Sequence, residues 1–445
     1  MYSKKIIFKN LRKRAGIKNP DYYILLSIGL VLMYFLAGCS QTNPAGPSSS
    51  TAIVKGRVES NTAMNKVGST GSGVQGATVI LAEVRSDGSL ETISNAAVQT
   101  DIDGNFSLET NMNNLSDLVV IANKDSSQWM AVVSSSVNSS STVYVRPLND
   151  ETTAMASVYI RAKADNYSNV TYPEIDNYIN SKIAAQIKSN SALIGETAAS
   201  LNAEANAEYE SASEMGLSQS QWQAIINDKY NAQASLDEQL YNSSAPDDSS
   251  AYESYYQSLV NAYINAGASA DTYAKLLIIA NSEFVKSTSN LNSQLSFYFE
   301  QSAAYLRAKV TNYAVQEKFK AMGASNAEIE AAAAAGLSLS SSIKNASAQS
   351  DIDNSFSNYR TQIVAELKML FNSNQEMVTA ISSKAQLYNS TFKSDVSSGS
   401  STNDIISAYN KFYSGINSSV AASFGSGSQS QINDMTDMMV IVYGS

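Results

Sequence analysis

The sequence lacks most of the side chains on which familiar catalytic sites depend. Its 445 residues include no histidine and a single cysteine, Cys39. Without histidine there is no Ser-His-Asp triad, no Cys-His dyad, no HExxH zinc site and no histidine proton relay. A lone cysteine also leaves no internal disulfide, so the fold must be stabilised by buried apolar area and packing.

Nucleotide-binding motifs are missing as well. The chain has no GxxxxGK[ST] loop, and no GxGxxG motif lies between a predicted strand and a predicted helix. A carboxylate pair of the glycosidase kind or a Ser-Lys pair could still act, but neither has a recognisable pattern here. The sequence therefore predicts a protein that is not an enzyme and that has no cofactor.

The N-terminal segment joins a basic stretch to an apolar one. Residues 1–21 carry seven Lys or Arg residues and one acid, as expected on the cytoplasmic side of an inserting segment. Residues 22–37 form an apolar run of 16 residues. This length is short for a membrane span of about 20 residues but typical of a signal peptide. The run ends in Leu36-Ala37-Gly38-Cys39, which a Ser/Pro-rich stretch follows.

These four residues resemble the lipobox of bacterial lipoproteins and match it at every position. The resemblance implies cleavage between Gly38 and Cys39, diacylation of the Cys39 thiol and attachment to a membrane through this lipid. Residues 1–38 are then a signal peptide, and residues 39–51 are a linker with the lipidated cysteine. Ser40 stands where an aspartate favours inner-membrane retention, so we expect an envelope protein of the outer membrane. The alternative is an uncleaved signal anchor with an incidental cysteine.

The charge of the chain argues against polyanionic partners. The net charge is −10, and removal of residues 1–38 leaves 23 basic and 39 acidic residues, a net charge of −16. Nucleic acids and anionic lipid surfaces are held by clusters of Lys and Arg. We therefore expect no nucleic-acid partner.

Residues 52–148 show the two-residue apolar periodicity of β-strands. Seven short strands in about 100 residues are typical of a β-sandwich, here with Val79, Leu81, Phe106, Val119 and Ile121 in its core. The predicted strands cover residues 53–58, 76–84, 91–100, 105–110, 118–123, 128–134 and 142–147.

Three segments of this region, VKGRV, GATVILAEV and TDIDGNFSLET, resemble the carboxypeptidase regulatory-like domain, a transthyretin-like sandwich of seven strands. The matching positions are Gly56, Val58, Gly76, Ala77, Val79, Thr100, Asp101, Gly104 and Phe106. Residues 60–75 are longer than the usual connection, and we interpret them as a tolerated insertion rather than an interaction site. The resemblance implies a non-catalytic accessory module.

Asp101, Asp103 and Asn105 alternate in the third segment. Three oxygen-bearing side chains on one side of a turn could bind calcium. Asp side chains at a hairpin also accept hydrogen bonds from the backbone two residues on, and no bidentate Glu stands at the distance that an EF-hand requires. We favour the hairpin role.

Residues 149–445 have helical periodicity and predict an elongated antiparallel bundle of seven to nine helices. Capping boxes begin at Thr171, Ser218 and Ser325. The isoleucines at 175, 179, 183 and 187 form one apolar stripe. Glycines at 216, 267, 323 and 336 are predicted to separate helices.

Residues 270–322 contain no glycine or proline and predict the longest helix. Large side chains recur every seven residues along it, at Leu277, Phe284, Leu291, Tyr298 and Tyr305. A two-stranded coiled coil also needs an apolar residue four positions after each of these, and only Leu295 meets this requirement. The pattern therefore favours a helix within a bundle.

Tyrosines gather in two groups in the helical region. They are Tyr252, Tyr255, Tyr256 and Tyr263, and Tyr298, Tyr305 and Tyr313. They could form an aromatic platform for a glycan or peptide. Because most of them lie at helical spacing, we favour packing between helices.

The sequence thus favours a lipid-anchored, non-catalytic envelope protein that displays a helical bundle for structural or partner-binding work. Its partner would be a protein or glycan of the envelope. The alternative is a lipid-anchored ligand-binding protein or carboxylate-dependent hydrolase with a cleft in the helical region. An acid pair about 5–9.5 Å apart in a deep aromatic-lined cleft would favour the alternative.

Overall fold

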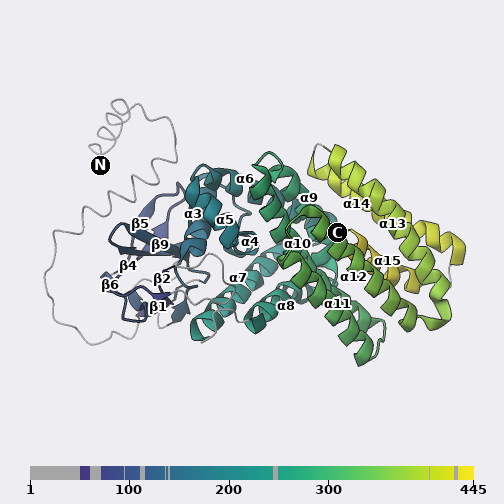
Figure 1. Cartoon of the computed structure of the whole chain (residues 1–445), viewed down its shortest axis with the longest axis horizontal. Helices are drawn as coiled ribbons and strands as arrows, with labels where there is room; N and C mark the ends of the chain where they lie inside the picture. Colours follow the sequence, from purple (N-terminus) through teal and green to yellow (C-terminus); the bar gives the residue numbers. More distant parts are fainter. Residues whose placement is uncertain are drawn as a thin grey trace.

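The computed structural model describes residues 51–60, 72–94, 96–110, 116–135, 137–138, 141–243, 249–399, 401–424 and 429–444. The predicted signal peptide, Cys39 and most of the predicted insertion lie outside these residues. In the described part, ten short strands precede 13 α-helices. The predicted order of a β region followed by an α region is therefore confirmed, and Figure 1 shows the two at opposite ends of a long molecule.

The strands of the described residues form three sheets. The largest has the order β5 (Leu90–Thr92), β4 (Thr78–Val84), β8 (Leu118–Lys124), β9 (Ser127–Val132), and β6 (Val98–Gln99) also pairs with β4. The second has the order β10 (Thr142–Tyr144), β1 (Ala52–Arg57), β7 (Asn105–Thr110). β2 (Glu59–Ser60) and β3 (Ser72–Gly73) form a small third sheet. The segment that we expected to form one strand over residues 91–100 instead contributes to two short strands, β5 and β6. The short strands β2 and β3 were not predicted.

The largest sheet is buried on both faces. Val79 and Leu81 of β4 pack with residues of the second sheet, whereas Ile80 and Ala82 pack with the helices. α3 (Asp150–Ala164) lies on this second face, next to β9. The near-continuous apolar sequence of β4 is typical of a strand buried on both sides. The hydrophobic core of the helical region therefore includes one face of the sheet.

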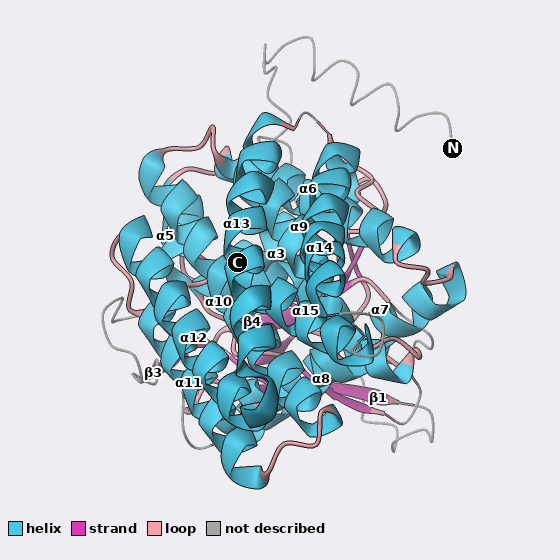
Figure 2. Cartoon of the chain, turned by 90° about the vertical axis from the view of Figure 1, so that its right-hand side faces the viewer, coloured by secondary structure: helices cyan, strands magenta, loops and turns pink. Residues whose placement is uncertain are grey.

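The remaining helices extend away from the sheet. They are α4 (Tyr172–Tyr178), α5 (Ser181–Ser189), α6 (Leu193–Glu214), α7 (Gln219–Asn242), α8 (Ser249–Asn265), α9 (Thr272–Thr288), α10 (Ser293–Ala321), α11 (Asn326–Lys344), α12 (Gln349–Leu370), α13 (Gln375–Ser398), α14 (Thr402–Phe424) and α15 (Gln429–Tyr443). Seen from the end opposite the β region, α13, α14 and α15 lie in front of the strands (Figure 2). None of the described helices has both the length and the apolarity to cross a bilayer.

Local sequence chemistry explains several helix boundaries. The predicted capping boxes begin α4, α7 and α11, with Thr171, Ser218 and Ser325 as the N-caps. Gly216, which follows α6, has a positive φ of 90°, as glycine at a helix end commonly does.

Gly336 was expected to end a helix, and this prediction is wrong. It lies inside α11, facing α10. A Cβ atom at this position would lie 2.1 Å from Oδ1 of Asn312, so glycine permits close approach of the two helices rather than a break.

The expected long helix over 270–322 is also wrong, because it is divided into α9 and α10. Asn292 is the N-cap of α10, and its Oδ1 accepts a hydrogen bond from the Leu295 amide at 3.0 Å. Phe284 of α9 and Phe299 of α10 then meet edge to face, with centroids 5.4 Å apart. A short polar side chain thus caps the start of α10, the antiparallel neighbour of α9, at a boundary without glycine or proline.

The isoleucine stripe is divided in the same way. α4 ends at Tyr178, and Asn180 is the N-cap of α5, accepting hydrogen bonds from the amides of Lys182 and Ile183. The four isoleucines are nevertheless buried, so the predicted apolar face is correct although the helix is not continuous.

Candidate functional site

The hairpin at Asp101 is held by its own side chains. Asp101 Oδ1 accepts hydrogen bonds from the backbone amides of Asp103 (3.0 Å) and Asn105 (2.8 Å), and its Oδ2 accepts one from the Asn105 amide group at 3.3 Å. Both carboxylate oxygens of Asp101 therefore serve the turn, which matches the favoured hairpin role. Among the described residues, no group of three or more acids is placed to hold a metal ion.

A buried group of charged side chains lies inside the helical region, around Lys229 of α7. Its Nζ donates to Glu208 of α6 at 2.6 Å and to Glu174 of α4 at 3.0 Å. The ammonium also lies over the Tyr273 ring, 4.8 Å from its centroid. The side chains of Lys229 and Glu208 are each 1% exposed, so this group is closed to solvent.

Glu208 and Lys229 stabilise each other's charge in this site. Burial raises the pKa of Glu208, while Lys229 opposes that rise. Burial alone would lower the pKa of Lys229, but Glu208 and its neighbours raise it well above the usual range. The ammonium is therefore charged at neutral pH, and Glu208 is the carboxylate that pairs with it most closely.

Glu204, one turn before Glu208, is best explained as a neutral acid. The Tyr178 hydroxyl lies 2.6 Å from Oδ1 of Asn281 and 3.0 Å from Oε1 of Glu204. The Asn281 amide donates to the Ala303 carbonyl, so its Oδ1 is the acceptor for the single tyrosine proton. Glu204 must then donate to the tyrosine oxygen. Burial, followed by Glu208 and Glu174, raises the pKa of Glu204 well above its usual value, which fits this assignment.

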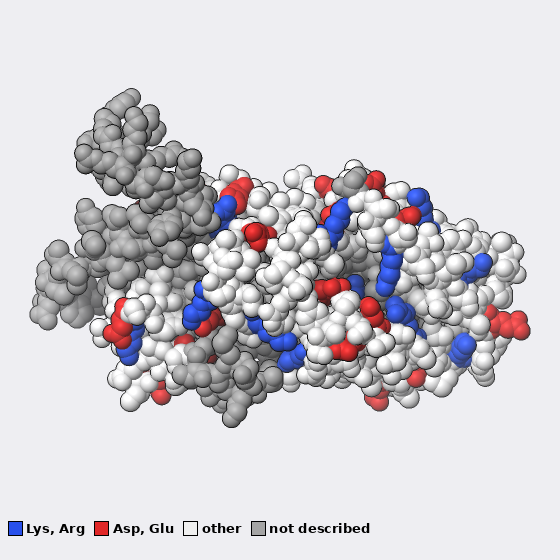
Figure 3. Space-filling view, turned by 45° about the horizontal axis from the view of Figure 1, so that its top comes forward, with Lys and Arg blue, Asp and Glu red and all other residues white. Residues whose placement is uncertain are grey.

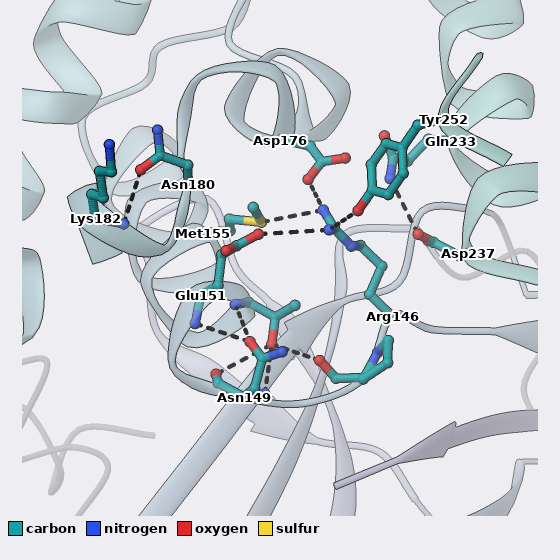
Figure 4. A network of polar contacts seen from close by, with 12 residues as sticks. Arg146, Asn149, Glu151, Met155, Asp176, Asn180, Lys182, Gln233, Asp237 and Tyr252 are labelled. Atoms are coloured by element: carbon teal, nitrogen blue, oxygen red, sulfur yellow. Dashed lines mark hydrogen bonds and ion pairs between the residues drawn. The ribbon is translucent and has the colours of Figure 1, made fainter. Parts of the chain in front are cut away.

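A second buried network joins the β region to the helices at Arg146, which follows β10 (Figure 4). Its guanidinium forms an ion pair with Asp176 of α4 and donates to the Tyr252 hydroxyl of α8 at 2.8 Å. Glu151 of α3 lies 3.7 Å from the same guanidinium. One arginine, 7% exposed, thus contacts three helices.

Asp237 of α7 lies near this network and is fully buried. Its carboxylate accepts hydrogen bonds from the Ser134 hydroxyl at 2.6 Å and from the Gln233 amide at 3.1 Å. Burial raises the pKa of Asp237 to about 7, against the lowering effects of Ser134 and Arg146. Its ionisation is therefore coupled to the contact between the β region and α7.

A third network holds α15 against α9 and α10. Lys275 lies 2.6 Å from both Asp271 and Asp437, and Lys318 lies 2.8 Å from Asp437. Burial alone would raise the pKa of Asp271, but the two lysines lower it below the usual value. The fully buried Asp271 is therefore ionised and paired.

Two of the hollows on the surface of the described residues have no acid in their lining. The first, of about 240 Å³, lies between α11 and α12 and is lined mainly by Ser, Thr and Asn side chains. The second, of about 550 Å³, includes Lys182, Phe297 and Tyr298. Figure 3 shows one face of the molecule, where side chains of both charge signs gather around a hollow in the helical region.

Most of the clustered tyrosines pack between helices. Tyr255, Tyr256 and Tyr263 are buried, and Tyr256 meets the Tyr305 ring with centroids 6.0 Å apart. The Tyr313 hydroxyl donates to Glu253 at 2.8 Å. The tyrosines therefore contribute to the core, as favoured from their spacing, and Tyr298 lines the second hollow.

The sequence did not reveal the buried charged networks. In the sequence, Glu174 was recognisable only as a member of a capping box. In the structure, its Oε2 accepts a hydrogen bond from the Thr171 amide of that cap, and its Oε1 pairs with Lys229. The polar residues four positions after the seven-residue repeat, such as Asn281, Ser302 and Lys309, are buried. Their occurrence at core positions was the available indication of an internal polar network.

No protein-family model, no curated protein and no solved structure matches this chain.

Proposed function

We propose that this protein is a lipid-anchored, non-catalytic envelope protein whose helical region serves structural or partner-binding work. Lipid attached to Cys39 anchors the protein in the outer membrane, and its partner is a protein or glycan of the envelope. In this proposal the β region is a transthyretin-like sandwich of the carboxypeptidase regulatory-like kind that joins the anchor to the helices.

One observation carries the non-catalytic part of the proposal. Three acids that lie close together, Glu174, Glu204 and Glu208, are at most 4% exposed and surround a lysine that is 1% exposed. A glycosidase-type acid pair must flank a substrate bond and leave room for it. These acids instead contact a lysine and two tyrosines inside the core. The two surface hollows described above have no acids in their linings, which also disfavours the hydrolase alternative.

The anchor is tested by replacing its thiol. Cells producing the Cys39→Ala variant should incorporate no radiolabelled palmitate into this protein and should accumulate a longer, unprocessed chain. The matched variant Ser40→Ala retains the thiol and should be labelled like the wild type. Labelling of Cys39→Ala would disprove lipidation at this site.

The membrane assignment has a separate test. Ser40→Asp introduces the residue that favours inner-membrane retention in the lipoproteins that this segment resembles. On a density gradient, the wild type should sediment with outer-membrane vesicles, and Ser40→Asp should move to the inner-membrane fraction. Wild-type protein in the inner-membrane fraction would contradict the outer-membrane proposal but not the lipid anchor.

The non-catalytic proposal is tested with the detergent-solubilised protein. Incubation with isolated envelope polysaccharide should release no new reducing ends, while envelope material should co-purify with the protein. Release of reducing ends by the wild type would establish the hydrolase alternative.

A further inference from the structure

The second of the two surface hollows described above lies where three parts of the helical region meet. It is formed by α5, the first turns of α10 and the connection between α11 and α12. Its volume of about 550 Å³ is within the range of about 300–1,000 Å³ that is usual for small-molecule sites. Two aromatic rings, Phe297 and Tyr298, line it together with polar side chains and one cation, Lys182. The hollow therefore combines the kinds of side chain from which a ligand site is built.

A buried glutamine holds these three parts together. Gln301 of α10, which is 4% exposed, donates through Nε2 to the carbonyls of Ile343 (2.8 Å) and Ala346 (3.0 Å) at the end of α11. Its Oε1 accepts a hydrogen bond from Nζ of Lys182 of α5 at 3.2 Å. Because one side chain contacts all three parts, the walls are fixed in place before a ligand arrives, and this lowers the cost of binding.

Lys182 is positioned in the hollow without a negative partner. Besides its hydrogen bond to Gln301, its ammonium lies over the Tyr298 ring, 5.2 Å from the centroid. It forms no ion pair among the described residues, and no acid lines the hollow. Asp351 contacts Ser347, but this carboxylate is used by the amides that precede α12. An anionic group that enters the hollow can therefore pair with Lys182.

The other polar side chains of the lining match the hydroxyl groups of a sugar. Gln294 donates to the Tyr298 hydroxyl at 2.9 Å, and Asn345 donates to the Ser341 carbonyl at 2.9 Å. The side-chain oxygens of Gln294 and Asn345 accept no hydrogen bond among the described residues. A sugar hydroxyl both donates and accepts, so it can bond to these oxygens and to the hydroxyl of Ser293.

The lining favours a sugar over a peptide. A peptide is usually held by pairing with a strand edge or by an apolar groove that takes a helix. This hollow is lined by helical residues and a connection, and its apolar lining is limited to Phe297, Ala346 and the Tyr298 ring. The C–H groups of a sugar ring can pack on the negative face of an aromatic ring such as Phe297, while hydroxyl groups at the sugar's edge reach polar side chains.

We propose that this hollow binds a sugar ring that carries a carboxylate. The carboxylate pairs with Lys182, the ring packs against Phe297, and the hydroxyl groups bond to the amide and hydroxyl side chains of the lining. The inference rests on the proposed function, because it selects a glycan from the two classes of envelope partner named there.

The test is isothermal titration calorimetry of the detergent-solubilised protein at constant ionic strength. Trigalacturonate is the acidic probe, and its methyl ester has the same rings without the charge. The wild type should bind trigalacturonate at least about tenfold more tightly than the ester, since only the acid forms a charge-assisted hydrogen bond. Lys182→Gln should remove this difference by weakening binding of the acid alone, and Phe297→Ala should weaken binding of both.

The matched control is Lys188→Gln. It removes another exposed lysine of α5, one that lies outside the lining of the hollow, and it should leave both affinities unchanged. Lys182 is exposed, so Lys182→Gln should fold, and it decides the question alone if Phe297→Ala does not fold.

The proposal is overturned if the wild type does not bind trigalacturonate, if the ester binds equally tightly, or if Lys188→Gln weakens binding as much as Lys182→Gln. Triglutamate tests the peptide alternative. Tighter binding of triglutamate than of trigalacturonate, with the same loss in Lys182→Gln, would reject a sugar in favour of an acidic peptide.

Failure of this site and failure of the proposed function give different results. Absence of binding would reject the sugar site and would leave the anchor at Cys39 to its own labelling test. Conversely, recovery of trigalacturonate as shorter sugars after incubation would contradict the non-catalytic proposal even if the hollow binds this sugar.

Discussion

The two regions of this molecule bury polar groups in different ways. The core between the two larger sheets is built from Val, Leu, Ala and Phe side chains. Among the described residues before α3, the buried charged side chains are Glu59 and Arg146, and Arg146 faces the helices. The described residues from α3 onward include seven: Glu174, Glu204, Glu208, Lys229, Asp237, Asp271 and Lys309.

The difference follows from how each region satisfies its backbone. In a sheet, the hydrogen-bond ladder between neighbours fixes the register, so side chains need only fill the core. A helix satisfies its own backbone, and faces rich in Ala and Ser can pack in several registers. We infer that buried ion pairs specify which helices pack together here, a role that polar core residues have in coiled coils.

The largest expected effect comes from leaving buried acids unpaired. Lys229→Met removes the cation that lies between Glu174 and Glu208, and we expect it to lower the free energy of unfolding by about 3–5 kcal/mol. Urea denaturation followed by circular dichroism measures this loss. The control Lys188→Met removes a lysine that is 67% exposed and paired with Asp150, and should cost less than about 1 kcal/mol.

A compensated variant sharpens the same point. Glu174→Gln and Glu208→Gln, added to Lys229→Met, remove the uncompensated charges and should restore most of the lost stability. Equal losses in Lys229→Met and Lys188→Met would show that the buried pairs do not support the helical region.

A smaller loss is expected from the apolar core of the sheets. Leu81→Ala creates a cavity between the two larger sheets and should lower the free energy of unfolding by about 2–4 kcal/mol. Ile102→Ala, at a side chain that is 74% exposed, is the matched control and should have little effect. Equal losses of unfolding free energy in Ile102→Ala and Leu81→Ala would show that the core between the sheets does not stabilise this region.

The contact between the regions should respond to pH through Asp237. Because burial raises its folded-state pKa to about 7, the folded protein binds this proton more tightly than the unfolded chain. The stabilisation is present at acidic pH and is lost as the pH rises toward 7 and above. Between pH 5 and 7 this group should lower the free energy of unfolding by roughly 2 kcal/mol.

Asp237→Asn isolates this contribution, because the amide resembles the neutral acid. Its unfolding free energy, measured by urea denaturation at several pH values, should fall less between pH 5 and 7 than that of the wild type. Glu204 and Glu208 titrate in both proteins, so their contributions cancel in the difference. Parallel pH profiles for the two proteins would contradict the assignment.

Local signals in the sequence predicted the order of the regions, most strands and the capping boxes, because each depends on residues a few positions apart. The Lys229 network joins residues that are 21 and 55 positions apart in the sequence, so no local pattern could reveal it. The hairpin role of Asp101 could be predicted, because its hydrogen-bond partners are only two and four residues away.

The smallest expected effect concerns the break between α9 and α10. If the Asn292 cap alone caused the break, Asn292→Ala would merge the two helices. The contact between Phe284 and Phe299 holds them as antiparallel neighbours, so we expect the break to persist with a loss of about 1 kcal/mol for the cap. Urea denaturation measures the loss, and unchanged circular dichroism at 222 nm shows that no continuous helix has formed. A rise in helical signal would mean that Asn292, rather than packing, determines the fold of this hairpin.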